Sequence, residues 1–328
     1  MNTPELPPDD NAPPIASTSA AFYHPEQPAP PRQHECEPYQ RQVMRPLVLF
    51  IATCLSTFWV GTCDWIPTLH MTSFEQAGLA LVENWQQGLI YMAAVLGILL
   101  PHEMGHFVMT LRYRIPASWP YFIPVPFTAL GTMGAVIAMH ARQADRRQLF
   151  DVGLAGPLAG LAVALPISWI GIQQLAPPPA HDLGFCFHNP LIFRILIDYL
   201  HPEFVDSSVL HLSQLNPFVW AGWCGMLITG LNMLPISQLD GGHVSYALLG
   251  RRAHYLARGV LIAAILYVLI SDQIFWVLMV VLVTLMGTDH PPTADDRVPL
   301  GWGRRLIGYA SLTIPILCFP PGISQSLQ

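Results

Sequence analysis

After about residue 40 the chain alternates between long apolar runs and short polar connections. A helix that crosses a bilayer needs about 20 mostly apolar residues. The last run is short and contains Pro315 and Pro320, with Pro321 directly after it, so it either lies flat or re-enters the membrane. The pattern predicts an all-α polytopic membrane protein with about six or seven transmembrane helices. The candidate runs are 46–62, 88–111, 149–172, 216–237, 256–271, 274–288 and, more weakly, 304–320.

Composition supports a membrane protein. The 328 residues are 52% hydrophobic and only 11% charged, whereas soluble domains carry roughly 25% charged residues. All basic residues are Arg, and they fall in small groups between apolar runs rather than on one face, which argues against nucleic-acid binding. The six cysteines show no CxxC or CxxH spacing, so a thiolate zinc site is not expected.

Residues 1–40 differ from the rest of the chain. They contain ten prolines together with polar residues and almost no aliphatic side chains. Such a segment buries too little apolar surface to offset the entropy of ordering, so we predict a disordered N-terminal tail. Residues 41–328 then form the membrane-embedded domain.

The arginine groups predict the topology, because cytoplasmic loops are enriched in basic residues. The segments 63–87 and 173–215 contain a single arginine, Arg194. A cytoplasmic N-terminus places every other group inside, provided that residues 256–288 cross twice. These groups are Arg41 and Arg45; Arg112 and Arg114; Arg142, Arg146 and Arg147; Arg251, Arg252 and Arg258; and Arg297, Arg304 and Arg305.

The segment 116–139 is apolar but cannot form a regular helix, because it contains four prolines. Arginine groups of the cytoplasmic type flank it on both sides. We therefore expect an extended re-entrant hairpin that enters and leaves the membrane on one side. Non-helical backbone at membrane depth must pack on protein or line a wet cavity. The alternative is a cytoplasmic surface loop.

The second apolar run contains His102-Glu103-Met104-Gly105-His106. Positions i and i+4 share one face of a helix, so both imidazoles can reach one metal ion, and the glutamate between them can move protons. Each ionisable group at the bilayer centre costs on the order of 2.5–3.5 kcal/mol, and a metal would compensate. Solvated histidines at a helix end are the alternative.

Two histidines and a water leave zinc one protein ligand short. Asp240 follows the fourth run on the same predicted side of the membrane, where Pro235 breaks the helix and Gly241-Gly242 permit close backbone approach. We predict Asp240 as the third ligand. The alternative is that Asp240 caps a helix beginning at about His243.

Together with a second motif, Asn232-x-x-Pro235-x-x-x-x-Asp240-Gly241, the histidine motif closely resembles the site-2 proteases, a family of intramembrane zinc metalloproteases. The resemblance covers about residues 88–250 and points to the branch that includes chloroplast and bacterial homologues. Further similar blocks are Gly156-Pro157-Leu158-Ala159-Gly160, Tyr121-Phe122-Ile123-Pro124 and Leu130-Gly131-Thr132-Met133-Gly134.

The resemblance implies one Zn²⁺ per chain on His102, His106 and Asp240, with Glu103 as catalytic base and acid. It implies that Asn232 assists the substrate or the intermediate. It also implies a substrate that is a single-span membrane protein in the same lipid bilayer. We expect the active site on the cytoplasmic side, as in a bacterial inner membrane. The segment 173–215 is too short for the PDZ domain that many members carry.

Several residues carry weaker expectations. His140 could approach the metal but is more typical of a surface residue, and His243 could orient Asp240. Cys63 and Cys186 fall in predicted external loops and could form a disulfide. The glycines at 153, 156 and 160 are typical of close helix packing in lipid.

Two other functions remain open. A membrane metal transporter would show extra ionisable groups along several spans and an internal repeat, and neither is seen here. A catalytically silent scaffold that binds membrane helices would not need Glu103 between its two histidines. Zinc retention and cleavage of a membrane helix would discriminate between these functions.

Overall fold

The computed structural model describes residues 43–71, 73–139, 141–177, 185–204, 206–271 and 276–325. The predicted disordered tail and His140 lie outside these residues. Four helical stretches are long and apolar enough to cross a membrane. They are α1 (Met44–Thr62), α4 (Trp85–Tyr113), α5 (Arg146–Gln173) and the continuous stretch Asp240–Ser271, which contains α8 (Asp240–Leu249), η3 (Gly250–Arg252) and α9 (Ala253–Ser271).

The remaining predicted spans are shorter helices. The fourth apolar run forms α7 (Pro217–Asn232), and the sixth forms α10 (Val277–Met286). The weak terminal run divides into α11 (Trp302–Ser311) and α12 (Ile314–Cys318), with Pro315 in the first turn of α12. Proline lacks an amide donor and fits best in the first turn of a helix, although α4 and α5 also contain prolines in their interiors. Six or seven crossings therefore remain a prediction.

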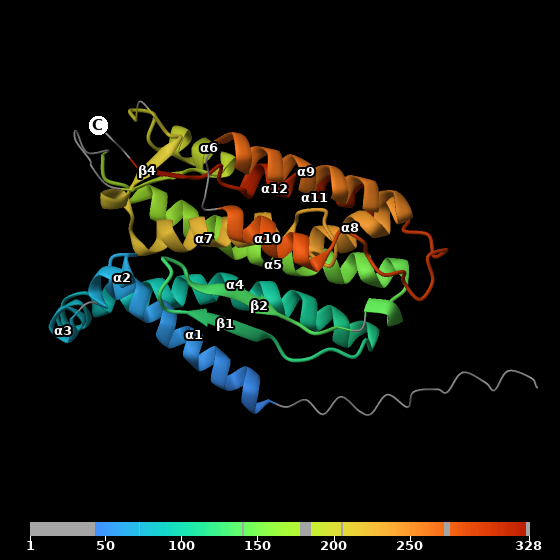
Figure 1. Cartoon of the computed structure of the whole chain (residues 1–328), viewed down its shortest axis with the longest axis horizontal. Coiled ribbons are helices and arrows are strands. Elements are labelled where there is room, and N and C mark those ends of the chain that lie inside the picture. Colours follow the sequence, from blue (N-terminus) through green and yellow to red (C-terminus); the bar gives the residue numbers. More distant parts are fainter. Residues whose placement is uncertain are drawn as a thin grey trace, which may run out of the picture. The chain divides into compact units, whose positions relative to one another are not determined.

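The centre of the fold is formed by α4, α5 and α7, which lie side by side along the horizontal axis of Figure 1. Helix α1 packs against α4. At their crossing a Cβ on Gly61 would lie 2.8 Å from the Cα of Gly88. Small residues let helix backbones approach closely in lipid, where packing rather than burial drives helix association.

The segment predicted to be extended forms an antiparallel hairpin of β1 (Tyr121–Val125) and β2 (Gly131–Val136). The pairing shifts register between Phe122 and Pro124. The hairpin packs on α1, where Ser56 Oγ donates to the carbonyl of Gly131 at 2.6 Å and the rings of Phe50 and Phe122 meet edge to face. Figure 1 shows it beside α1 and α4. Its entry into the bilayer remains a prediction.

An all-α protein with one hairpin is too simple a description. A three-stranded sheet with the order β4-β3-β5 is also present, and short helices connect the longer elements. The pattern missed these strands because they span only three or four residues, and because β5 pairs with a strand far away in the chain. Cys63 and Cys186 do not form a disulfide with each other. The additional elements are α2 (Pro67–His70), α3 (Phe74–Glu83), η1 (Ala141–Gln143), β3 (Phe185–His188), α6 (Leu191–Leu200), β4 (Val209–His211), η2 (Leu212–Gln214) and β5 (Ile323–Gln325).

Candidate metal centre

The two motif histidines lie on the buried face of α4. His102 is 1% exposed and His106 is 8% exposed, and their ring centroids are 5.2 Å apart. A helix places residues four apart one above the other on the same face. The structure therefore brings both imidazoles together in the interior of a membrane helix bundle, as the spacing predicts.

Asp240 joins the histidine pair from a different element. Its Oδ2 atom lies 3.4 Å from His102 Nε2 and 3.2 Å from His106 Nε2. One ligand atom from each of the three residues lies within 4.8 Å of the others. Helix α8 begins at Asp240 itself, and its N-cap, Leu239, makes no side-chain cap. The alternative reading of Asp240 as the cap of a helix starting at His243 is therefore wrong.

These three residues fit a zinc ion. Among the described residues, Asp240 Oδ2 is a buried oxygen without a hydrogen bond, and a buried polar atom of this kind calls for a partner. His106 Nδ1 lies 2.8 Å from the carbonyl of Val152, which can only accept, so Nδ1 donates and Nε2 keeps its lone pair. Two imidazole nitrogens and a carboxylate form a typical donor set for zinc with a position left open for water.

Glycines of α5 make room for the ligands. A Cβ on Gly156 would lie 2.0 Å from His106 Nε2, and one on Gly160 would lie 2.9 Å from His102 Nδ1. A Cβ on Gly153 would lie 2.8 Å from the Cβ of His243. From the sequence, these glycines were expected only to permit close helix packing. Their spacing on one face of α5 contained the signal, but only the position of α4 shows what they face.

A tight turn brings Asp240 back toward the end of α7. Ser237 adopts a left-handed backbone conformation with a φ of 49°. A Cβ on Gly241 would lie 2.0 Å from the carbonyl oxygen of Met233, and one on Gly242 would lie 2.2 Å from that of Ser237. Only glycine permits such close backbone contact. The glycine pair therefore lets α8 begin in close contact with the backbone at the end of α7 and in the turn that follows it.

Glu103 and Asn232 border a cavity beside the three ligands. The cavity has a volume of about 480 Å³ and is also lined by His106, Asp240 and the residues 135–139 of the hairpin. Glu103 is 4% exposed. Asn232, the last residue of α7, places its Nδ2 atom 3.3 Å from His102 Nε2. All five predicted site residues thus meet in one place, and their chemical roles remain predictions.

His243 was expected to orient Asp240, but the structure gives it another partner. Its Nδ1 atom lies 2.7 Å from Nε2 of His290. His290 lies in the segment after α10 and is buried, although nothing in the sequence pattern singles it out. A histidine in a connection rich in proline and aspartate carries no signal of burial, so only the fold could reveal this pair.

A membrane helix bundle that brings a carboxylate to both histidines of a His-Glu-x-x-His helix has the features of the membrane metallopeptidases. The chain belongs to this class through its sequence as well. The profile of Peptidase family M50 matches residues 90–271, more than half of the chain, and the chain belongs to that family. The resemblance to the site-2 proteases is thereby confirmed, as is its link to the chloroplast homologues.

The relatives are zinc metalloproteases by name. The chain is 28% identical to the probable zinc metalloprotease EGY1, chloroplastic, of Arabidopsis thaliana, over 85% of this chain and 53% of the relative. It is 30% identical to EGY1 of Oryza sativa subsp. japonica, over 85% and 50%. It is 29% identical to EGY2 of Arabidopsis thaliana, over 71% and 42%. The chain thus spans about half the length of these relatives, and no solved structure matches it.

Proposed function

We propose that this chain is a zinc-dependent endopeptidase that hydrolyses peptide bonds of membrane-spanning proteins within or at the edge of the bilayer. The observation that carries the proposal is the meeting of His102, His106 and Asp240 with Glu103 at one buried cavity. Family membership and the zinc metalloprotease relatives support the same activity.

His102, His106 and Asp240 would hold the metal. Zinc in such a site polarises a carbonyl and lowers the pKa of its water. Glu103 takes the proton of the attacking water on its carboxylate and delivers it to the nitrogen of the leaving amine. The carbonyl of Val152 fixes the ring of His106 during these steps. The amide Nδ2 of Asn232 lies at the ligand edge of the cavity and can donate to the carbonyl oxygen that gains negative charge.

The hairpin supports a membrane-spanning substrate. Strand β2 pairs with β1 along one edge only, among the described residues, and residues 135–139 line the cavity. An unwound substrate segment can add to the other edge as a strand, so that main-chain hydrogen bonds hold it beside the ligands. A photocrosslinker at Val136, which lines the cavity, should capture substrate. One at Phe127, which is exposed but does not line the cavity, should capture none.

Reconstitution of the purified chain tests the activity. The wild type should retain about one zinc per chain and cleave a single-span test helix in proteoliposomes, and Glu103→Gln should retain the metal without cleaving. Zinc transport across the vesicle wall without cleavage would favour the transporter instead. Binding of the helix with no cleavage by the wild type would favour the scaffold.

The arginine groups support a cytoplasmic N-terminus and a cytoplasmic active site. Glu75 is an exposed residue of α3, between α1 and α4. A cysteine introduced there should react with an impermeant thiol reagent from outside the cell. Labelling only from the cytoplasmic side would reverse the proposed topology. The named relatives are chloroplastic, so a bacterial inner membrane remains part of the proposal and not a finding.

A further inference from the structure

The three proposed ligands come from two separate parts of the chain. His102 and His106 share α4, whose helical geometry fixes their spacing. Asp240 is the first residue of α8, a helix of ten residues that follows a tight turn. The distance between Asp240 and the histidines therefore depends on how α8 is held against α4 and α5. A contact that fixes α8 would control the metal geometry without touching the metal.

The segment that follows α10 makes such a contact. Residues 289–296, here named the clasp segment, include His290, which lies 2.7 Å from His243 on α8. His290 Nδ1 lies 2.6 Å from the carbonyl of Pro291, which can only accept. His290 Nδ1 therefore donates, and its Nε2 accepts from Nδ1 of His243. Burial lowers the pKa of His290, which favours the neutral ring.

The clasp segment contacts α8 at a second point. The hydroxyl of Tyr246 donates to Asp296 Oδ2 at 3.0 Å, and its ring stacks on that of His290 with centroids 4.5 Å apart. His243 and Tyr246 are three positions apart, so both lie on the same face of α8. Two hydrogen bonds and two ring contacts, of His243 and of Tyr246 with His290, thus fix this face.

The other end of the clasp segment is tied to α5. The amide of Ala294 donates to the carbonyl of Ala144 at 2.9 Å, and the amide of Arg146 donates to the carbonyl of Asp295 at 3.3 Å. Helix α5 starts at Arg146 and also carries Val152, whose carbonyl holds His106. The clasp segment therefore connects the helix that carries Asp240 to the helix that orients His106.

We propose that His290 is a positioning residue for the metal centre: through its hydrogen bond with His243 it holds α8 so that Asp240 meets the histidine pair. The inference rests on the proposed zinc peptidase function. Groups that orient metal ligands typically account for about 10–100-fold in metal affinity or activity. His290 acts on the proposed ligands only indirectly, through His243 on α8. We therefore expect His290→Ala to weaken zinc binding and to lower kcat by about tenfold, with KM unchanged.

The test uses the full chain in detergent, with zinc affinity measured by competition with a chelator. The visible spectrum of the cobalt-substituted protein reports the ligand geometry, and a role in folding alone would not change it. His290→Gln supplies an oxygen that can accept from His243 and should restore most of the affinity and the spectrum. Asp295→Ala is the matched control, because it removes the hydrogen bond that Asp295 Oδ1 accepts from the amide of Arg297, and no described contact joins this side chain to α8.

The outcomes separate this inference from the proposed function. If the wild type binds no zinc, or binds it equally after His102→Ala, the proposed function fails. If the wild type binds zinc at the His102 site and His290→Ala keeps the same affinity, cobalt spectrum and kcat, the function stands and the positioning role is refuted. A fall in melting temperature equal to that of Asp295→Ala, with the metal properties unchanged, would also refute it.

Discussion

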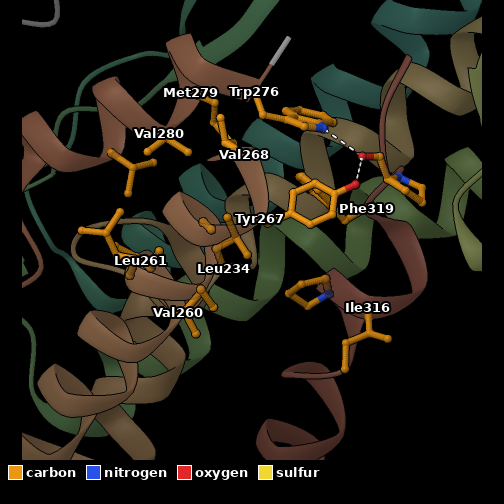
Figure 2. A pocket seen from close by; sticks show the side chains of 16 residues that line it. Leu234, Val260, Leu261, Tyr267, Val268, Trp276, Met279, Val280, Ile316 and Phe319 are labelled. Carbon is orange, nitrogen blue, oxygen red and sulfur yellow. Dashed lines mark hydrogen bonds between the residues drawn. The ribbon is translucent and has the colours of Figure 1, made fainter. Parts of the chain in front are cut away.

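Two cavities of similar size are lined in part by the segment 233–239, and they differ in chemistry. The metal cavity has a volume of about 480 Å³ and receives Gln238 and Leu239 from this segment. The apolar cavity has a volume of about 520 Å³ and receives Leu234 and Ile236. Figure 2 shows the apolar cavity, where aliphatic side chains of α9 and α10 face Ile316 and Phe319 near the C-terminus.

The polar groups of the two cavities have different partners. In the apolar cavity, Tyr267 Oη and Trp276 Nε1 both donate to the carbonyl of Pro321, which satisfies them locally (Figure 2). In the metal cavity, Asp240 Oδ2 is buried without a hydrogen bond among the described residues. Buried ionisable groups are costly in a membrane, so they indicate function where apolar volume does not. Their similar volumes do not separate the two cavities, whereas the partners of their buried polar groups do.

Among substitutions in the two cavities, removal of a proposed metal ligand should have the largest effect on zinc content and cleavage. Asp240→Asn replaces a carboxylate by a neutral amide, which is a poorer zinc ligand, so zinc and cleavage should be lost together. Glu103→Gln keeps all three ligands but cannot move the proton, so kcat should fall about 10²–10⁴-fold while zinc remains. Metal analysis and cleavage assays of both variants decide the assignment. Full zinc and full cleavage in Asp240→Asn would place the third ligand elsewhere.

A methyl group placed between α5 and His106 should have the next largest effect. Gly156→Ala puts a Cβ where His106 Nε2 lies, so the imidazole must move away from the metal position. We expect zinc affinity to fall about 10–100-fold, as for other changes that misplace a ligand. Gly97→Ala on α4 is the matched control, since its Cβ meets nothing within 4 Å. Equal zinc affinity in the two variants would limit Gly156 to helix packing.

The part of the site that could be predicted from the sequence is the part that is local in the chain. His102 and His106 face one another because four residues complete about one helical turn. Asp240 required a further argument, that Pro235 and the glycine pair break the span at the right depth. Its approach to the histidines agrees with that argument, but its distance depends on the turn at Ser237, which no pattern encodes.

The parts that escaped prediction depend on partners far away in the chain. A glycine at position 156 is compatible with a helix backbone or with an imidazole beside it, so the sequence could indicate only close packing. The role proposed for His290 depends on its hydrogen bond with His243, which lies 47 residues earlier in the chain. The sheet of β3, β4 and β5 escaped for the same reason, because short strands show no period and because β5 pairs with a strand far earlier in the chain, with Gln325 opposite Phe185.

Replacing one alanine by leucine in each cavity should have the smallest effect on cleavage, and it compares the two cavities most directly. Ala264 lines the apolar cavity and Ala135 lines the metal cavity, and both side chains are half-buried. Ala264→Leu fills apolar volume next to other aliphatic groups, so kcat/KM should stay within about twofold of the wild type, a difference below 1 kcal/mol.

Ala135→Leu instead adds three carbons to the wall that faces Glu103 and Asp240, where a substrate strand would lie. Overpacking of this kind typically costs about 1–3 kcal/mol, so kcat/KM should fall about tenfold or more while zinc content stays at the wild-type value. Cleavage of one test helix by both variants, with zinc measured in each, makes the comparison. If Ala264→Leu were the more damaging variant with its zinc intact, the apolar cavity would have to be counted as part of the catalytic machinery.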